Sequence, residues 1–235
     1  MSAFLRAAVV AAQLLAMCVV TSAGAQPAVN DPPQIVFSSS PAILILIDGD
    51  PVYRTIDGTD LQRIVNTKSL IVRNAAGIYY LRLRNRWMES YWLTGWWTRS
   101  GTPPEGASEA IRQAANDTSA DPLEGGGVSE TAAGASPTVY VYTTPAVLIV
   151  TDGPPRFVPL DGTPLRYLEN THADVLEDPD GYLYVLTSGR WLRARDTSGP
   201  WMYVPSEGLP NAFAHIPDNS PKAHVKGTRG GDGGR

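Results

Sequence analysis

The chain has 235 residues, of which 43% are apolar, 18% charged and 9% aromatic, and its formal net charge is −4 at pH 7. These values exclude a collagen-like, coiled-coil or wholly disordered protein. The small acidic net charge argues against nucleic-acid binding, because no domain has the excess of basic residues that contacts with phosphates require. The 22 Gly and 20 Pro disfavour long helices and favour short strands joined by turns.

The first 25 residues have the pattern of a secretory signal peptide. Arg6 precedes an uncharged apolar run over 7–20, and the small residues at 23–25 suit a signal peptidase. No later stretch is apolar over the roughly 20 residues that span a bilayer. We therefore expect a periplasmic or secreted protein with no transmembrane segment in the mature chain, whose first residues, 26–34, form a flexible N-terminus.

The only cysteine, Cys18, lies inside this apolar run. After cleavage the chain would have no thiol, no disulfide and no cysteine-ligated metal. Lipid attachment at Cys18 is the alternative interpretation of the same segment. It is disfavoured because Met17 is a poor residue immediately before a lipidated cysteine.

The remaining chain contains an internal repeat. Residues 41–97 match residues 145–201 at a constant offset of 104, with 19 identities in 57 positions and no gap. The identities include Asp-Gly pairs, which favour hairpin turns because both residues tolerate positive φ. Between the turns lie strand-length runs rich in Ile, Val, Leu and Tyr. The sequence thus predicts an all-β protein of two homologous small antiparallel β domains, a tandem duplication, with about six short strands in each.

The expected boundaries follow from composition. The two β repeats are predicted over 35–100 and 138–225, and the second includes a C-terminal strap from Pro205 onward. The segment 101–137 is a flexible linker by composition, with a short helix expected over 108–115. That helix could dock on a β unit or form transiently in solvent. Residues 226–235 are expected to be a disordered tail.

Aromatic residues give the first functional signal. Trp87 and Trp97 recur as Trp191 and Trp201, so we expect both pairs in the cores. Four other aromatics have no aromatic counterpart in the second copy, so the fold does not require them. Exposed Trp and Tyr rings stack on sugars or anchor protein partners. The candidate ligand contacts are therefore Tyr79, Tyr91, Trp92 and Trp96.

Arg82 and Arg84 lie close to these aromatics in the sequence and join the candidate site. They could select an anionic glycan or an acidic partner, or they could be a solvated strand face whose guanidinium groups stack on rings. The strand Tyr80 to Arg84 alternates, which places Leu81 on the opposite face from Arg82 and Arg84.

Catalytic motifs are lacking in the sequence. It has no HExxH, no GxSxG, no phosphate loop and no cysteine nucleophile, and none of the three His is matched in the first copy. The acids shared by both copies, Asp48/Asp152 and Asp57/Asp161, precede Gly in turns. A glycosidase pair or a calcium site is the alternative to a turn role there. We expect no enzyme activity, no cofactor and no metal.

The second copy contains four strings that are similar to repeat-containing exported bacterial proteins labelled carbohydrate-binding family V/XII-like: Leu148 to Phe157, Leu183 to Trp191, Gly199 to Trp201 and Ile216 to Lys222. The resemblance covers roughly 140–225 well and 41–100 more loosely, and it implies a chitin- or glycan-binding module with aromatic contacts. The expected function is therefore non-catalytic binding of a polysaccharide or cell-envelope glycan. A protein–protein interaction or scaffold module of the envelope is the alternative.

Overall fold

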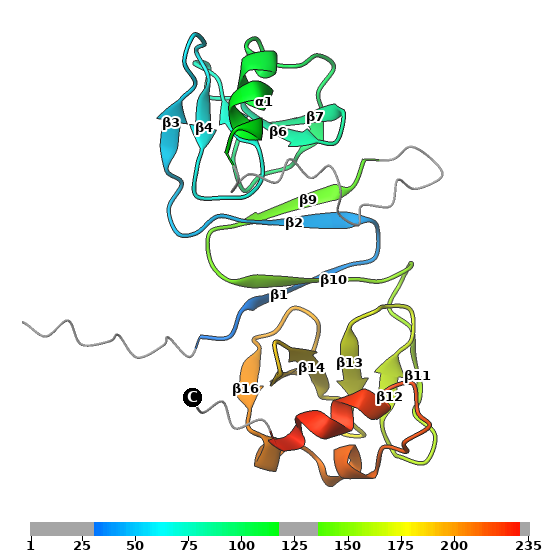
Figure 1. Ribbon diagram of the computed structural model, residues 1–235. Coiled ribbons are helices and arrows are strands. Elements are labelled where there is room, and N and C mark those ends of the chain that lie inside the picture. Colours follow the sequence, from blue (N-terminus) through cyan, green and yellow to red (C-terminus); the bar gives the residue numbers. More distant parts are fainter. Residues whose placement is uncertain (1–30, 118–135, 231–235) are drawn as a thin grey trace, which may run out of the picture. The chain divides into compact units, whose positions relative to one another are not determined.

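The computed structural model describes residues 31–117 and 136–230. Within these residues the protein is mostly β, with two six-stranded antiparallel sheets and one α-helix (Figure 1). The all-β fold of two homologous units is therefore confirmed. The expected signal peptide, Cys18 and most of the expected flexible N-terminus lie outside the described residues, as does the linker from 118 to 135.

Each six-stranded sheet is a meander in which consecutive strands are neighbours. The first sheet contains β3 (Tyr53–Thr55), β4 (Gln62–Ile64), β5 (Ile71–Arg73), β6 (Tyr79–Leu83), β7 (Arg86–Ser90) and β8 (Thr98–Arg99). The second contains β11 (Phe157–Pro159), β12 (Arg166–Leu168), β13 (Asp174–Glu177), β14 (Leu183–Thr187), β15 (Arg190–Ala194) and β16 (Met202–Val204). The strands of the two sheets correspond at the offset of 104, to within one residue at an end.

Four further strands form two parallel pairs that join the two repeats. β1 (Gln34–Ser38) pairs with β10 (Ala146–Val150), and β2 (Ala42–Leu46) pairs with β9 (Thr138–Tyr142) (Figure 1). The offset of 104 maps β1 onto β9 and β2 onto β10. Each repeat therefore gives its first strand to the other repeat. This exchange is not part of the sequence-based expectation, which treats the repeats as two separate β domains.

The first sheet has a core on each face. On one face β2 and β9 pack over the sheet, and Val139 and Val141 from the second repeat join a cluster that includes Trp97. On the other face the helix α1 (Ala107–Ala115) packs over Trp87, because Ala107, Ala110 and Ala114 recur on one side of the helix. The predicted short helix is thus present, and it is docked on the β unit.

The second sheet repeats this arrangement with a different cover. β1 and β10 pack over one face, where Ile35 from the first repeat joins a cluster that includes Trp201. The other face is covered by the C-terminal segment, in which Phe213 packs edge-on against Trp191 with ring centroids 5.1 Å apart. Both Trp pairs are therefore core residues, as the sequence predicts.

The C-terminal segment contains three 3₁₀-helices: η1 (Ser206–Gly208), η2 (Asn211–His215) and η3 (Ala223–Gly230). Leu209, Phe213, Ile216 and Val225 are buried against the second sheet. Because η3 runs to Gly230, it includes the first five residues of the expected disordered tail. The rest of that tail, 231–235, lies outside the described residues.

Candidate functional site: an exposed aromatic loop

The loop over 91–97 connects β7 to β8 and is anchored in the first core. Leu93 and Trp97 face inward and pack in the cluster that β2 and β9 cover. Trp97 Nε1 donates a hydrogen bond to Leu93 O over 3.2 Å. The two inward side chains therefore fix the base of the loop.

A hydrogen-bonded turn fixes the outer part of this loop. Ser90 Oγ donates to Trp92 O over 2.8 Å, and Gly95 N donates to the same carbonyl over 2.9 Å. A Cβ on residue 95 would lie 3.1 Å from Trp92 O, so the close approach of the two backbone segments favours glycine. The turn holds Trp92 in place without burying its ring.

Three aromatic side chains of the loop face solvent. The exposed fractions are 71% for Tyr91, 72% for Trp92 and 87% for Trp96. The Tyr91 and Trp92 rings are neighbours, with centroids 6.1 Å apart and planes tilted by 58°. Large aromatic side chains on a fixed loop lose little conformational entropy when they bind a ligand, so this loop is a candidate contact surface.

Tyr79, the fourth candidate aromatic, is half-buried at the same end of the sheet. β6 pairs with β7 so that Tyr79 lies opposite Ser90, where the loop begins. Its hydroxyl forms a 2.9 Å hydrogen bond with the hydroxyl of Tyr53. Burial, reinforced by this bond, raises the pKa of Tyr53 to about 12. Tyr79 therefore supports the core below the loop and presents only part of its ring to solvent.

The structure does not bring the two candidate arginines to the aromatic loop. Arg82 lies on the face that α1 covers, and its guanidinium carbon is 5.8 Å from the centroid of the Trp87 ring. Arg84 is in the turn between β6 and β7, with φ of 51°, at the opposite hairpin end from Ser90. Arg84 is thus not on the strand face where alternation alone would place it.

The second repeat has a loop of the same kind without the exposed rings. The positions equivalent to Tyr91, Trp92 and Trp96 hold Arg195, Asp196 and Pro200. The guanidinium carbon of Arg195 lies 3.7 Å from the centroid of the Tyr182 ring, and Asp196 Oδ1 accepts a 2.8 Å hydrogen bond from Ser198 N. The polar residues of this loop are therefore engaged within the repeat, and the aromatic surface belongs to the first repeat alone.

A groove of about 460 Å³ runs along β9 next to the aromatic loop. It is lined by residues 94–96, which include Trp96, and by residues 138–144. Within the described residues β9 pairs only with β2. Thr138 N and Tyr142 O bond toward β2, so the backbone groups of Val139 and Val141 point to the unpaired edge. Sequence reasoning missed this groove, because only the strand exchange brings β9 beside Trp96.

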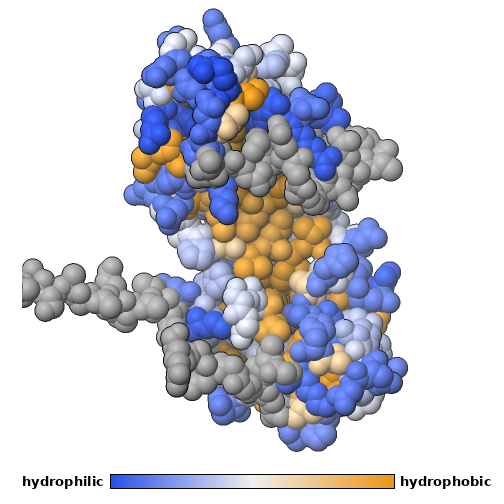
Figure 2. Space-filling model, in the orientation of Figure 1, coloured by the Kyte–Doolittle hydropathy of each residue, from blue (hydrophilic) through white to orange (hydrophobic). Residues whose placement is uncertain are grey.

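A second apolar surface lies over β2 and β10 (Figure 2). The residues that face away from the cores on these strands are Leu44 and Leu46 on β2, and Leu148 and Val150 on β10. Leu46 is 46% exposed, and the other three side chains are half-buried. This surface is continuous in the figure, and Tyr140 and Tyr142 of β9 lie opposite Leu44 and Leu46 at its edge.

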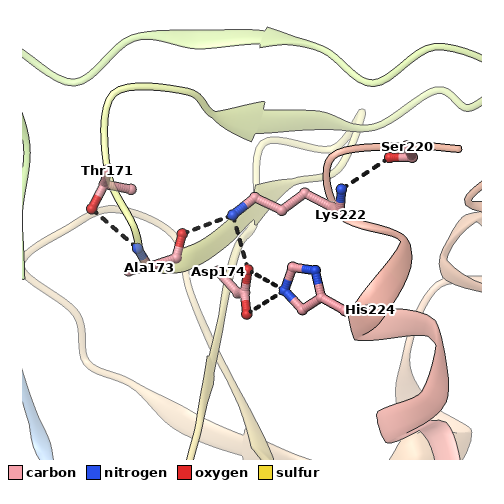
Figure 3. A network of polar contacts seen from close by, with 6 residues as sticks. All are labelled: Thr171, Ala173, Asp174, Ser220, Lys222 and His224. Carbon is pink, nitrogen blue, oxygen red and sulfur yellow. Dashed lines mark hydrogen bonds and ion pairs between the residues drawn. The ribbon is translucent and has the colours of Figure 1, made fainter.

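A connected polar cluster ties the C-terminal segment to β13 (Figure 3). Lys222 Nζ donates to Asp174 Oδ1 over 2.9 Å and to Ala173 O over 3.0 Å, and His224 Nε2 lies 2.9 Å from both Asp174 oxygens. Burial alone would raise the pKa of Asp174, but the bonds from Lys222 and His224 outweigh burial and hold it below its ordinary value. Because these groups bond to one another, the cluster holds the C-terminal strap against β13.

The paired acids of the Asp-Gly turns are exposed, and other side chains hold these turns. Asn66 Nδ2 donates to Asp48 O over 2.8 Å, and Thr59 Oγ1 donates to Ile56 O over 2.9 Å beside Asp57. Within 31–117 and 136–230, His, Cys, Asp and Glu form no group of three or more that could hold a metal ion. In the same residues no helix is long and apolar enough to cross a membrane.

The fold and the candidate site together define a mostly β protein of two interlocked repeats, with three exposed aromatic side chains on one loop of the first repeat. No protein-family model, curated protein or solved structure matches the chain.

Proposed function

We propose that the chain is an exported, non-catalytic binding protein that recognises a polysaccharide or cell-envelope glycan through Tyr91, Trp92 and Trp96. The observation that carries the proposal is the exposure of these three rings on a loop that the core and a hydrogen-bonded turn hold in place. Apolar rings of this size remain in water at a cost in free energy. A binding role accounts for their position, whereas a structural role would bury them.

Sugar polymers suit this surface chemically. Pyranose rings present flat C–H faces that stack on aromatic rings, and their hydroxyl groups stay in water at the rim. Two neighbouring rings that are tilted by 58° can contact adjacent parts of a curved chain. The resemblance of the second copy to exported carbohydrate-binding repeats agrees with this ligand class. The proposal places the glycan contacts in the first repeat, because the second repeat has no aromatic residue at these three positions.

The test is sedimentation of the purified protein with insoluble chitin, cellulose and peptidoglycan. We expect retention on at least one polymer, and about fivefold or more weaker retention for Trp92→Ala and Trp96→Ala, taking for a stacked ring the roughly 1–3 kcal/mol of base–aromatic stacking. Met202→Ala, which removes an exposed apolar side chain of the second repeat, is the matched control. No retention on any of the three polymers would reject the glycan proposal.

A protein partner is the second candidate, and the groove along β9 favours it. An extended segment could pair with the unpaired edge at Val139 and Val141 while a side chain packs on Trp96. Recovery of one stoichiometric envelope protein, with Trp96→Ala reducing its recovery and no glycan retained, would favour this function.

The export proposal has its own measurement. If residues 1–25 are a signal peptide, the mature protein in the periplasmic or secreted fraction begins at Gln26. N-terminal sequencing or intact-mass analysis of that fraction measures this directly. A chain that retains Met1 in the cytoplasm would reject the export proposal.

A further inference from the structure

The strand exchange between the two repeats is reciprocal and uses one register. Gln34 of β1 lies opposite Ala146 of β10, and Thr138 of β9 lies opposite Ala42 of β2. Because 34 and 138 differ by 104, as do 42 and 146, the two pairings are the same interaction made twice. The interface is therefore self-complementary in the way of a twofold dimer.

A single repeat cannot make this pairing with its own strands. Only residues 39–41 separate the end of β1 from the start of β2. A parallel pair in one chain needs a crossover of about a dozen residues. In the observed register, the connection would also have to run back about 13 Å along the strand and reverse direction twice. A connection of three residues cannot do this. The parallel partner of β2, and of its equivalent β10, therefore comes from the other repeat.

The exchanged strands are part of the cores that they join. Val139 and Val141 are buried in the cluster of the first sheet, and Ile35 is buried in the cluster of the second. The backbone bonds at the ends of the pairs match as well: Thr138 N donates to Pro41 O, and Gln34 N to Pro145 O, each over 2.9 Å. Removing one repeat would expose apolar groups and unpair backbone groups in the other.

The chemistry of the interface also fits association between copies. The four strands have the sequences QIVFS, AILIL, TVYVY and AVLIV and contain no charged residue. Pairing therefore depends on apolar burial and backbone hydrogen bonds, which salt weakens little. From Pro32 onward the contacts of the chain form one unit and do not separate at the linker.

We infer that the first strand of each repeat is an association arm whose partner is a second copy of the repeat, in the same chain or in another. The linker is then dispensable for the association. Two halves of one chain remain bound after the linker is cut, and halves from different chains exchange. This inference is independent of the proposed glycan function.

The experiment uses the full chain with a protease recognition sequence inserted after Gly126 and then cleaved. We expect the two halves to co-elute as a 1:1 complex in size-exclusion chromatography and native mass spectrometry at micromolar concentration. Refolding a mixture of tagged and untagged cleaved chains should give hybrid complexes. Two folded monomers that elute separately would overturn the inference.

A pair of variants links the result to the exchanged strand. Val141→Asp places a charge in the core and should weaken the association of the halves about 100-fold. Tyr140→Ser alters the neighbouring position, which faces away from that core, and should retain the complex. Equal loss in both variants would contradict a role for the buried face of β9.

A disulfide measurement covers the case in which Val141→Asp fails to fold. In a Cys18→Ser background, Leu44→Cys combined with Tyr140→Cys places two thiols at directly opposed positions of β2 and β9. After cleavage of the linker, oxidation should join the two halves into one species on a non-reducing gel. If each half instead folded its own two strands as an antiparallel hairpin, the halves would stay unlinked, and the inference would be wrong.

Discussion

Asn66 and Asn170 show why particular residues match between the repeats. The Asn66 amide accepts a hydrogen bond from Val52 N over 2.9 Å and donates to Asp48 O and Asp50 O, each over 2.8 Å. Asn170 holds the equivalent turn of the second repeat in the same way. One amide side chain therefore bridges two backbone segments. The carboxylates of Asp48 and Asp152, which the sequence predicts to have a role in these turns, stay exposed.

At Asp174, the structure predicts a pH-dependent contribution to stability. Replacing Asp174 by Asn leaves the buried Lys222 ammonium without its ion partner, and we expect a loss of about 3 kcal/mol at neutral pH. The pKa of Asp174 is lowered in the folded state, so its contribution is present above the unfolded pKa of about 4 and is lost as pH falls through the folded pKa. Urea titrations from pH 7 to pH 3 measure this.

The control for that prediction is Asp218→Asn. Asp218 also pairs with a lysine of the strap, Lys226, but its side chain is 92% exposed, so the change should be within about 0.5 kcal/mol. The stability difference between the wild type and Asp174→Asn should shrink below pH 4. A difference that is constant down to pH 3 would contradict the assigned role of the carboxylate.

At the scale of elements, the two repeats cover equivalent sheet faces with unrelated segments. In the first repeat the helix α1 contributes three alanines over Trp87, and in the second the 3₁₀ strap contributes Phe213 over Trp191. An apolar sheet face must be buried, but many shapes can bury it. The strap follows its sheet directly, whereas α1 lies in the segment that connects the repeats.

The start of α1 gives a prediction about this element. The sequence predicts a helix that starts at residue 108, whereas the helix begins at Ala107 with Gly106 as its N-cap at φ of 81°. A Cβ on Gly106 would lie 2.7 Å from Thr59 Cγ2. Gly106→Ala should therefore destabilise the protein by about 2 kcal/mol and loosen the helix from the sheet.

Denaturation followed by the fluorescence of the tryptophans measures the effect of Gly106→Ala, because Trp87 lies under α1. Gly101→Ala is the matched control, since a Cβ there meets nothing within 4 Å. This control should change stability by less than about 0.5 kcal/mol. Equal effects of the two substitutions would mean that the contact with Thr59 is unimportant.

At the scale of the whole molecule, the exchange predicts that a substitution in one repeat acts on the other. Phe37 belongs to the first repeat by sequence, but its ring stacks on Trp201 of the second, with centroids 6.2 Å apart and planes within 18°. Phe37→Ala should lower stability by about 2 kcal/mol through the half-buried contact that is lost. The indole N–H signal of Trp201 should shift in NMR spectra.

Val52→Ala, an exposed position of the first repeat, should leave both the Trp97 and the Trp201 signals in place. If the Phe37→Ala change instead moved Trp97 and spared Trp201, the strands would not be exchanged in solution. We also expect one thermal transition for both repeats, because each core contains a strand from the other.

By itself, the sequence determined the duplication, the short antiparallel strands, the core tryptophans and the presence of a short helix. These features depend on local turn chemistry and on apolar patterns that recur at one offset. It also set Tyr79, Tyr91, Trp92 and Trp96 apart from the core tryptophans, since their counterparts are not aromatic; Tyr79 packs against the first core, and the other three are exposed. The exposure of these three rings agrees with that separation.

Only the tertiary structure decided the strand exchange, the groove beside Trp96 and the separation of Arg82 and Arg84 from the aromatic loop. β1 and β9 share no identical residue at the offset of 104, and each pairs with a strand about 100 residues away. Local patterns cannot select between partners so distant in the chain. The choice follows from a connection too short for a repeat to close on itself and from the burial that the second repeat supplies.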